Sequence, residues 1–343
     1  MNQNVIKRMI VEGMIDKYIR EIKEDPKRSL RKFVDMGGNA TKSPFQKQAF
    51  MLIQSILAND NSPYYTLVNN LVNQINPETI KTFGINLGMN SWSYGSKMIR
   101  AQEARFGYNI PWSITFHCGD NSSVLGPKQM NTIISQGKEK GIMAYLFLFT
   151  GQCSLLSECF NLVQRHTDCS FVFFVPSSVL STGTISLITK CKNLMVSVNT
   201  TNDWVRSTSY LKGQKCLYGV HKTYSNQSEA ADILNGKWMQ EVANSGTPFA
   251  FCFGAEGCPE EVCKAVGLYI SKSRMEQKYP AFIVDYYADN LQIDQIISDG
   301  PCFMGVLPDG TITMCSNLTE QKTKQNIKDG NLQELLKRHP LIK

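Results

Sequence analysis

Residues 142–160 read IMAYLFLFTGQCSLLSECF, and this stretch indicates how the chain folds. A continuous apolar and aromatic run ends at Thr150 and Gly151, a short polar turn follows, and an apolar helical segment begins at Leu155. Continuous apolar strands are typical of parallel sheets that are covered on both faces. The turn would then lie at the carboxyl end of a strand, where α/β folds place their ligand-binding groups.

The same unit repeats along the middle of the chain. Short apolar runs alternate there with amphipathic segments, and the runs occupy residues 113–116, 142–149, 171–175, 194–198, 216–220 and 248–253. Strands that are separated by single helices pair in parallel. This region is too short for a closed eight-unit barrel, which needs roughly 250 residues. We therefore predict an α/β fold, a partial (β/α)6 TIM-like barrel.

Different patterns flank the predicted barrel. The first hundred or so residues have apolar side chains at helical spacing, interrupted by GGNATKSP and NDNSP. Near the other end, GPCFMGVLPDGTITMCSN predicts a β-hairpin around Pro308 to Gly310, and a short basic helix follows. We divide the chain into an N-terminal helical region (1–105), the partial barrel (106–285) and a cysteine-bearing hairpin with a terminal helix (286–343).

The composition describes an ordinary folded protein. Of the 343 residues, 42% are hydrophobic and 19% are charged, which argues against global disorder. The net charge of +7 is spread along the chain, so we expect no specific nucleic-acid partner. The N-terminus lacks the apolar centre of a secretory signal, and no apolar run approaches the ~20 residues of a membrane span. We expect a cytoplasmic protein without membrane contact.

The eleven cysteines are expected to be mostly free thiols, because a reducing compartment disfavours a disulfide framework. Cys302 and Cys315 flank the predicted hairpin, and Cys252, Cys258 and Cys263 would join them if the hairpin packs over their loop. Two thiolates are half of a zinc or iron–sulfur site. Two interpretations stay open, a metal site at Cys302 and Cys315 or reduced structural thiols.

In the order and spacing of its parts, the chain from Gly107 to Lys343 resembles the radical S-adenosylmethionine (radical SAM) superfamily with a SPASM-like C-terminal segment. YNIPWSITFHCG is similar to the family's first strand and cluster loop, and GIMAYLFLFTGQCSLL to its second strand and Gly-Gly-Glu-Pro-Leu-Leu motif. TDCSFVFFVPSSVL and NLMVSVNTT are similar to the third and fourth strands. GPCFMGVLPDGTITMCSN with NIKDGNLQELLKRHP resembles the auxiliary hairpin and its trailing helix.

The resemblance also shows which cofactor-binding residues are missing. The family holds a four-iron cluster with Cys-x-x-x-Cys-x-x-Cys, and only Cys118 stands at the first of these positions. Gly151 and Gln152 stand at the Gly-Gly-Glu motif, and the neutral Gln152 is a weaker partner for an ammonium group than glutamate. Ser197 is retained on the fourth strand, and Asn199 occupies a position that is commonly acidic. Gly151, Gln152 and Ser197 would be vestigial cofactor-binding residues.

These departures predict a degenerate radical SAM-like protein, a pseudoenzyme without catalytic residues or a catalytic 4Fe-4S loop. It would act as a binding or accessory subunit for a peptide or protein partner, for example an active radical SAM paralogue. We expect no cofactor at the barrel mouth and no S-adenosylmethionine binding; an Fe-S or Zn site would involve Cys302 and Cys315, with Cys118 a further metal-ligand candidate. The alternative is a repurposed enzyme that uses the barrel mouth or a metal site at the C-terminal cysteines.

Two further features bear on the barrel mouth. His117 precedes Cys118 at a strand end, but adjacent strand residues point to opposite faces, which argues against a Cys–His nucleophile pair. The segment 86–112, with Trp92 and Tyr94, either packs the helical arm onto the barrel or forms a ligand-facing wall. Without a cluster, we expect the mouth to be an open pocket beside this segment that favours amide-like or peptide groups.

Overall fold

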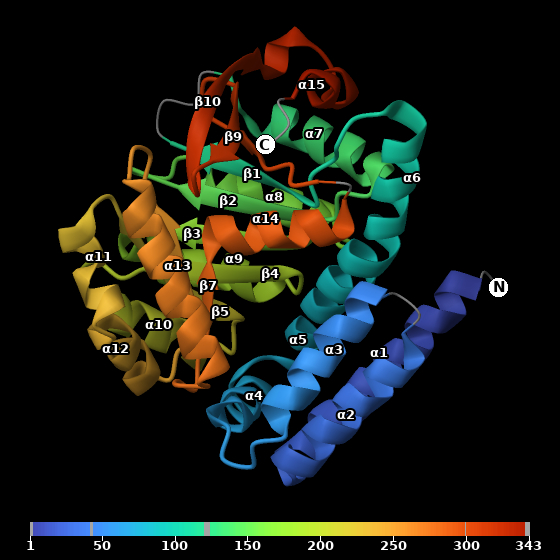
Figure 1. Cartoon of the computed structure of the whole chain (residues 1–343), viewed down its shortest axis with the longest axis vertical. Helices are drawn as coiled ribbons and strands as arrows, with labels where there is room; N and C mark the ends of the chain where they lie inside the picture. Colours follow the sequence, from blue (N-terminus) through green and yellow to red (C-terminus); the bar gives the residue numbers. More distant parts are fainter. Residues whose placement is uncertain (1–2, 42–43, 120–123, 299, 340–343) are drawn as a thin grey trace.

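The computed structural model describes residues 3–41, 44–119, 124–298 and 300–339 (Figure 1). Its middle consists of parallel strands in sequential order: β1 (Ser113–Cys118), β2 (Ala144–Phe149), β3 (Ser170–Val175), β4 (Leu194–Asn199), β5 (Tyr218–Tyr224), β6 (Phe249–Gly254) and β7 (Phe282–Asp285). The predicted partial TIM-like barrel is confirmed, with all six predicted strands in the predicted order. The sequence interpretation missed β7.

Helices follow the strands and cover the outer face of the curved sheet (Figure 1). They are α7 (Pro127–Lys140), α8 (Leu156–Arg165), η2 (Ser177–Val179), α9 (Thr182–Lys190), α10 (Trp204–Gly213), α11 (Gln227–Leu234), α12 (Lys237–Ser245) and α13 (Glu260–Met275). Between sheet and helices lies an aromatic core. The ring of Phe147 is 5.0 Å from that of Phe116 and 4.9 Å from that of Phe173, and all three are fully buried.

Helix α14 (Tyr286–Ile297) lies on the inner face of the sheet, against β1 (Figure 1). The hydroxyl oxygens of Tyr286 and Thr115 are 2.6 Å apart, and the Asp294 carboxylate accepts a 2.8 Å hydrogen bond from the Trp112 N–H. These contacts join α14 to the first half of β1 and to the residue before it. The concave side of the half-barrel is therefore occupied by a helix of the same chain.

The C-terminal segment extends the sheet beyond β1. β8 (Met304–Val306) pairs with β1 in parallel, and β9 (Thr311–Ser316) and β10 (Thr319–Asn326) follow as antiparallel neighbours; η3 (Ile327–Asp329) and α15 (Leu332–Arg338) complete it. The predicted hairpin is confirmed, and Gly310 has the positive φ of 84° that its turn requires. The strand β10 was not predicted.

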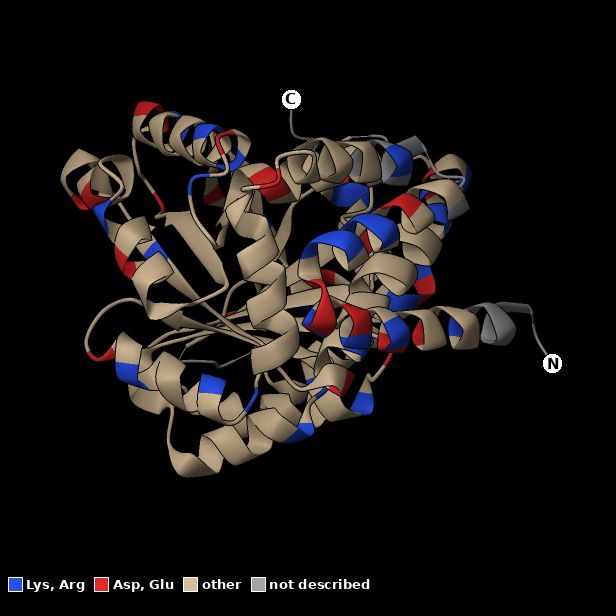
Figure 2. Cartoon of the chain, turned by 90° about the horizontal axis from the view of Figure 1, so that it is seen from below, with Lys and Arg blue, Asp and Glu red and all other residues tan. Residues whose placement is uncertain are grey.

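The N-terminal helices form a separate layer. They are α1 (Gln3–Glu24), α2 (Pro26–Ala40), α3 (Pro44–Leu57), α4 (Pro63–Gln74), α5 (Pro77–Ile85), the π-helix η1 (Asn86–Gly95) and α6 (Ser96–Phe106). Basic and acidic residues are interspersed along α1 (Figure 2), with ion pairs such as Arg8 and Glu12 at 2.8 Å. None of the described helices has the length and apolar character needed to cross a membrane.

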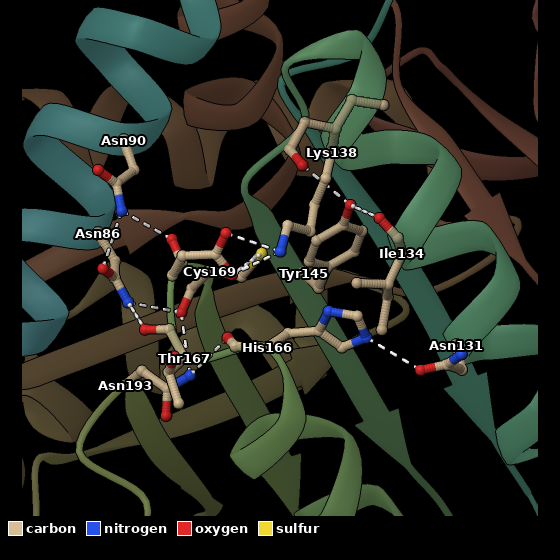
Figure 3. Close-up of polar contacts among 12 residues, drawn as sticks. Asn86, Asn90, Asn131, Ile134, Lys138, Tyr145, His166, Thr167, Cys169 and Asn193 are labelled. Atoms are coloured by element: carbon tan, nitrogen blue, oxygen red, sulfur yellow. Dashed lines mark hydrogen bonds and ion pairs between the residues drawn. The ribbon is translucent and has the colours of Figure 1, made fainter. Parts of the chain in front are cut away.

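The π-helix η1 fastens this layer to the amino edge of the sheet (Figure 3). The Asn86 side-chain amide donates to the carbonyls of Thr167 and Cys169, both at 2.8 Å, and Asn90 donates to the Asp168 carbonyl at 2.8 Å. These carbonyls belong to the loop that leads into β3. The segment 86–112 therefore packs the helical arm onto the barrel, and the expectation that it lies beside the carboxyl-end mouth is wrong.

Candidate ligand site at the mouth of the half-barrel

The turn after β2 has the backbone shape that the sequence suggested. The Thr150 N–H donates to the Cys118 carbonyl at 3.0 Å, and then Gly151 and Cys153 both take positive φ angles, 70° and 55°. Only glycine adopts this region without strain, and Cys153 does so with its side chain buried. Gly151 and Gln152 are exposed at the carboxyl edge of the sheet.

Cys118 ends β1 but faces away from the barrel interior. Side chains alternate along the strand, so that Phe116 and Cys118 belong to the outer aromatic core whereas Thr115 and His117 face inward. A hydrogen bond with Cys159 and burial both raise the pKa of the Cys118 thiol. Because the following residues 119–126 contain no cysteine, this loop does not supply the thiolates of a four-iron cluster, and its residues do not fit that group.

Ser197 lies deeper inside the half-barrel than the exposed turn after β2. Its side chain is completely buried, and its Oγ is 3.2 Å from Nδ1 of His221 on β5. The His221 ring meets Phe174 and Phe253 edge-on, at 5.4 and 5.7 Å between ring centres. Burial lowers the pKa of His221 to about 3, so the imidazole is neutral. The structure thus separates Ser197 from the exposed rim residues Gly151 and Gln152.

Aromatic side chains fill the concavity at this level. The ring of Phe253 lies 4.2 Å from that of Tyr286 and 4.9 Å from that of Phe174, and none of the three is more than 4% exposed. The expected open pocket is therefore wrong at the depth of Ser197. The expectation rested on the shortness of the loop after β1, which has few side chains to fill the mouth. The side chain that fills the interior instead comes from α14, as Tyr286.

The turn between β9 and β10 lies close to the end of β6, on the opposite side of the half-barrel from β1. A Cβ atom placed on Gly254, at the end of β6, would lie 3.4 Å from the Leu318 carbonyl oxygen and 3.5 Å from Cγ2 of Thr319. Asn317 and Leu318 form this turn with positive φ angles of 52° and 60°. The C-terminal segment therefore extends the sheet beside β1 through β8, and its β9–β10 turn approaches β6. This turn narrows the mouth of the half-barrel.

One ion pair joins β1 to this hairpin. His117 Nε2 lies 2.8 and 2.9 Å from the two carboxylate oxygens of Glu320 on β10, which also accepts hydrogen bonds from the Thr313 hydroxyl and, at 3.3 Å, from the Tyr287 hydroxyl. Burial alone would raise the pKa of Glu320, but the charge of His117 and these hydrogen bonds hold it below its usual value. The pair is thus a buried carboxylate that orients a partly exposed imidazole, as in general acid–base sites.

Sequence reasoning identified His117 but not its partner. Glu320 lies 203 positions further along the chain, in a strand whose mostly polar sequence, TEQKTKQN, carries no apolar alternation. Only the pairing of β8 with β1 brings the two side chains together. No local signal in the sequence marks this contact.

Glu320→Gln should loosen the hairpin, because the amide keeps the shape of the side chain but loses the charge that His117 faces. We expect a loss of about 1–3 kcal/mol in the free energy of local opening. Faster amide hydrogen exchange in β9 and β10 would report this. Glu241→Gln on α12 is a matched control, since Glu241 is exposed. Equal exchange rates in the two variants would contradict the role of the pair.

Cys302 and Cys315 have different surroundings in the structure. The backbone N–H of Cys302 donates to the Asp294 carboxylate at 3.3 Å, whereas Cys315 lies in the inner aromatic cluster. Burial raises the pKa of both thiols. Over the described ranges, no group of three or more His, Cys, Asp or Glu side chains is arranged to hold a metal ion. A metal site at Cys302 and Cys315 stays a prediction from sequence.

The parallel half-barrel with an antiparallel hairpin on its β1 edge defines the class of fold, and solved structures with a similar fold confirm the architecture that the predicted resemblance implies. No family model and no curated protein matches the sequence. One protein with a similar structure is SuiB of Streptococcus suis. One SuiB structure matches with a TM-score of 0.52 and 12% identity, over 70% of this chain and 69% of SuiB.

Two further SuiB structures match equally well. SuiB bound to S-adenosylmethionine has a TM-score of 0.51 and 11% identity, over 70% of this chain and 67% of that chain. SuiB bound to the precursor peptide SuiA has a TM-score of 0.51 and 13% identity, over 70% and 68%. At such low identity the likeness shows the fold and carries over no activity.

Proposed function

We propose that this chain is a degenerate radical SAM-like protein that binds a peptide or protein partner and does not cleave S-adenosylmethionine. The observation that most supports this proposal is the aromatic filling of the half-barrel by Phe174, Phe253 and Tyr286. A cofactor at the level of Ser197 would have to displace these rings from a tightly packed interior. The single thiol at Cys118 and the neutral Gln152 support the same proposal.

Peptide binding is the part of this function that a neighbouring structure suggests. SuiB has been seen with a precursor peptide as well as with S-adenosylmethionine. In this chain the departures fall on the residues that would serve S-adenosylmethionine. We therefore propose a peptide or an active radical SAM paralogue as the partner, with this chain as the accessory subunit.

The alternative, a repurposed enzyme, is favoured by one specific observation. The pair of His117 and Glu320 stands at the carboxyl end of β1, where barrel enzymes place their catalytic groups. The oriented imidazole could accept or donate a proton at the rim of the mouth. Such an activity would be lost on His117→Ala, because alanine can neither accept nor donate a proton.

Anaerobic reconstitution tests the proposal directly. After treatment with iron and sulfide, the protein should yield no 5′-deoxyadenosine above background from S-adenosylmethionine and a reductant, because the loop after β1 offers one thiol. Cys118→Ala is the matched control and should give the same background. Turnover in the wild type that disappears in Cys118→Ala would refute the pseudoenzyme.

Binding assays test the partner. Thermal shift measurements with short peptides and with S-adenosylmethionine should show stabilisation by peptides and none by S-adenosylmethionine. Gln152→Ala serves as the control for the turn after β2. Stabilisation by S-adenosylmethionine that Gln152→Ala abolishes would show that the old cofactor site still binds.

A further inference from the structure

A cavity of about 520 Å³ lies at the carboxyl ends of β3 and β4, outside the filled interior of the half-barrel. One wall is the segment 177–182, which connects β3 to α9 and includes the start of that helix. The other wall is formed by Asn202, Asp203 and the first turns of α10. Both the volume and the position between neighbouring parallel strands are typical of small-molecule sites in α/β folds.

Hydrogen bonds between the two walls hold the cavity in shape. The Ser177 hydroxyl donates to the Asn202 carbonyl at 2.7 Å, and the Ser207 hydroxyl donates back to the Ser177 carbonyl at 3.4 Å. On the first wall, the Ser181 hydroxyl accepts a hydrogen bond from the Thr184 N–H at 3.2 Å. These hydrogen bonds hold the connections after β3 and β4 against each other. The shape of the cavity is therefore set by the fold.

Arg206 is the cation in the lining of the cavity. Its guanidinium lies over the ring of Tyr210, 5.7 Å from the ring centre, and donates to the Tyr210 hydroxyl at 3.5 Å. Among the described residues, no carboxylate is within ion-pair distance of this guanidinium, although Asp203 is near enough to act on its pKa. An arginine that is stacked on one side keeps further N–H groups for a planar or tetrahedral anion.

The remaining lining matches a ligand with one charged and one apolar part. The hydroxyls of Ser178 and Thr182 come from the wall opposite Arg206, so hydrogen-bond donors are present on both sides. Leu180 and Ile185 contribute apolar surface next to them. A group with three acceptor oxygens can use donors on both walls, which a carboxylate with two oxygens does less well.

We propose that this cavity binds a small phosphate monoester, with Arg206 as the residue that holds the phosphate. This site lies at the carboxyl ends of β3 and β4, outside the filled interior, and it does not depend on the peptide-binding role. Asp203, on the rim, opposes the anion and limits its affinity. The opposite charges of Arg206 and Asp203 give the proposal two variants of opposite expected effect.

Calorimetric titration with phenyl phosphate, at low ionic strength to limit screening, tests this site. We expect phenyl phosphate to bind more tightly than inorganic phosphate or benzoate, because it offers both the phosphate and an apolar ring. Arg206→Gln should weaken binding at least tenfold, as the loss of charge-assisted hydrogen bonds predicts. Asp203→Asn should strengthen binding about two- to fivefold by removing a repulsive charge.

Lys190→Gln is the matched control, since Lys190 is an exposed cation at the opposite end of α9. It changes the net charge as Arg206→Gln does and should alter affinity by less than about twofold. The changed residues are all exposed, so thermal unfolding should confirm that each variant folds. Four outcomes would overturn the site: no binding of phenyl phosphate at millimolar concentration, no effect of Arg206→Gln, an equal loss in Lys190→Gln, or equal binding of benzoate.

Discussion

His221→Gln should flatten the acid side of the protein's pH–stability curve. The neutral His221 ring is buried between Phe174 and Phe253, and burial lowers its pKa to about 3, whereas an unfolded histidine titrates near about 6.5. As the pH falls below 6.5, the unfolded chain gains a proton that the native ring does not accept. The stability that His221 contributes is thus complete above pH 6.5 and is lost toward pH 3.

The size of this effect follows from the difference between the two pKa values. At about 1.36 kcal/mol per pH unit, the full contribution is about 5 kcal/mol, and about 3 kcal/mol of it is lost by pH 4.5. Asp285 acts in the opposite direction, because burial raises its pKa to about 6 and its protonation favours the folded state. The comparison of wild type with His221→Gln cancels this shared contribution.

Urea unfolding at pH 7.5, 5.5 and 4.5 measures the prediction. The free energy of unfolding of the wild type should fall by about 3 kcal/mol more than that of His221→Gln between the highest and lowest pH. Glutamine can still hydrogen-bond to Ser197, so the variant is expected to fold. Parallel pH dependences for the two proteins would mean that His221 is protonated in the native state.

Asn193→Leu should destabilise the protein by about 2–4 kcal/mol. The buried Asn193 side-chain amide donates to the carbonyls of Val163, His166 and Cys169, at 3.1, 3.0 and 3.1 Å (Figure 3). Leucine has a similar volume but no donor, so buried carbonyls lose partners that water cannot replace. Asn193→Asp should be worse, because it puts a buried negative charge beside these carbonyls.

Chemical unfolding of both variants checks the Asn193 prediction. Asn73→Leu is the control, since the exposed Asn73 bonds only to Asn69 in its own helix and should change stability by less than about 0.5 kcal/mol. A loss in Asn193→Leu no greater than in this control would show that water reaches the loop before β3 in the folded protein.

The main part of the sheet was predictable because each of its units is local. A buried parallel strand needs a continuous apolar run, and residues 144–149 and 170–175 have one. β7 spans only Phe282–Asp285, with Phe282 partly exposed and α14 starting at once, so its pattern is too short to recognise. β10 lies at the edge of the sheet, and its polar side chains carry no alternation.

The candidate site was predictable only where it depends on residues that are close together in the sequence. The turn at Gly151 follows from the glycine and from the end of the apolar run. The depth of Ser197 depends on Tyr286, which enters from a helix far away in sequence, and the partner of His117 depends on the pairing of β8 with β1. Such contacts are set by how the sheet curves, and residue spacing does not reveal them.

The position of β1 between β2 and β8 determines when the sheet can be completed during synthesis. β1 meets β2 soon after both leave the ribosome, but its other edge pairs with residues 304–306, which are made about 190 residues later. Until then, the hydrogen-bonding edge of a buried apolar strand is open to other chains. Nascent chains that stall before β8 are therefore expected to aggregate or to recruit chaperones, even though the N-terminal helices and most of the parallel strands have already been synthesised.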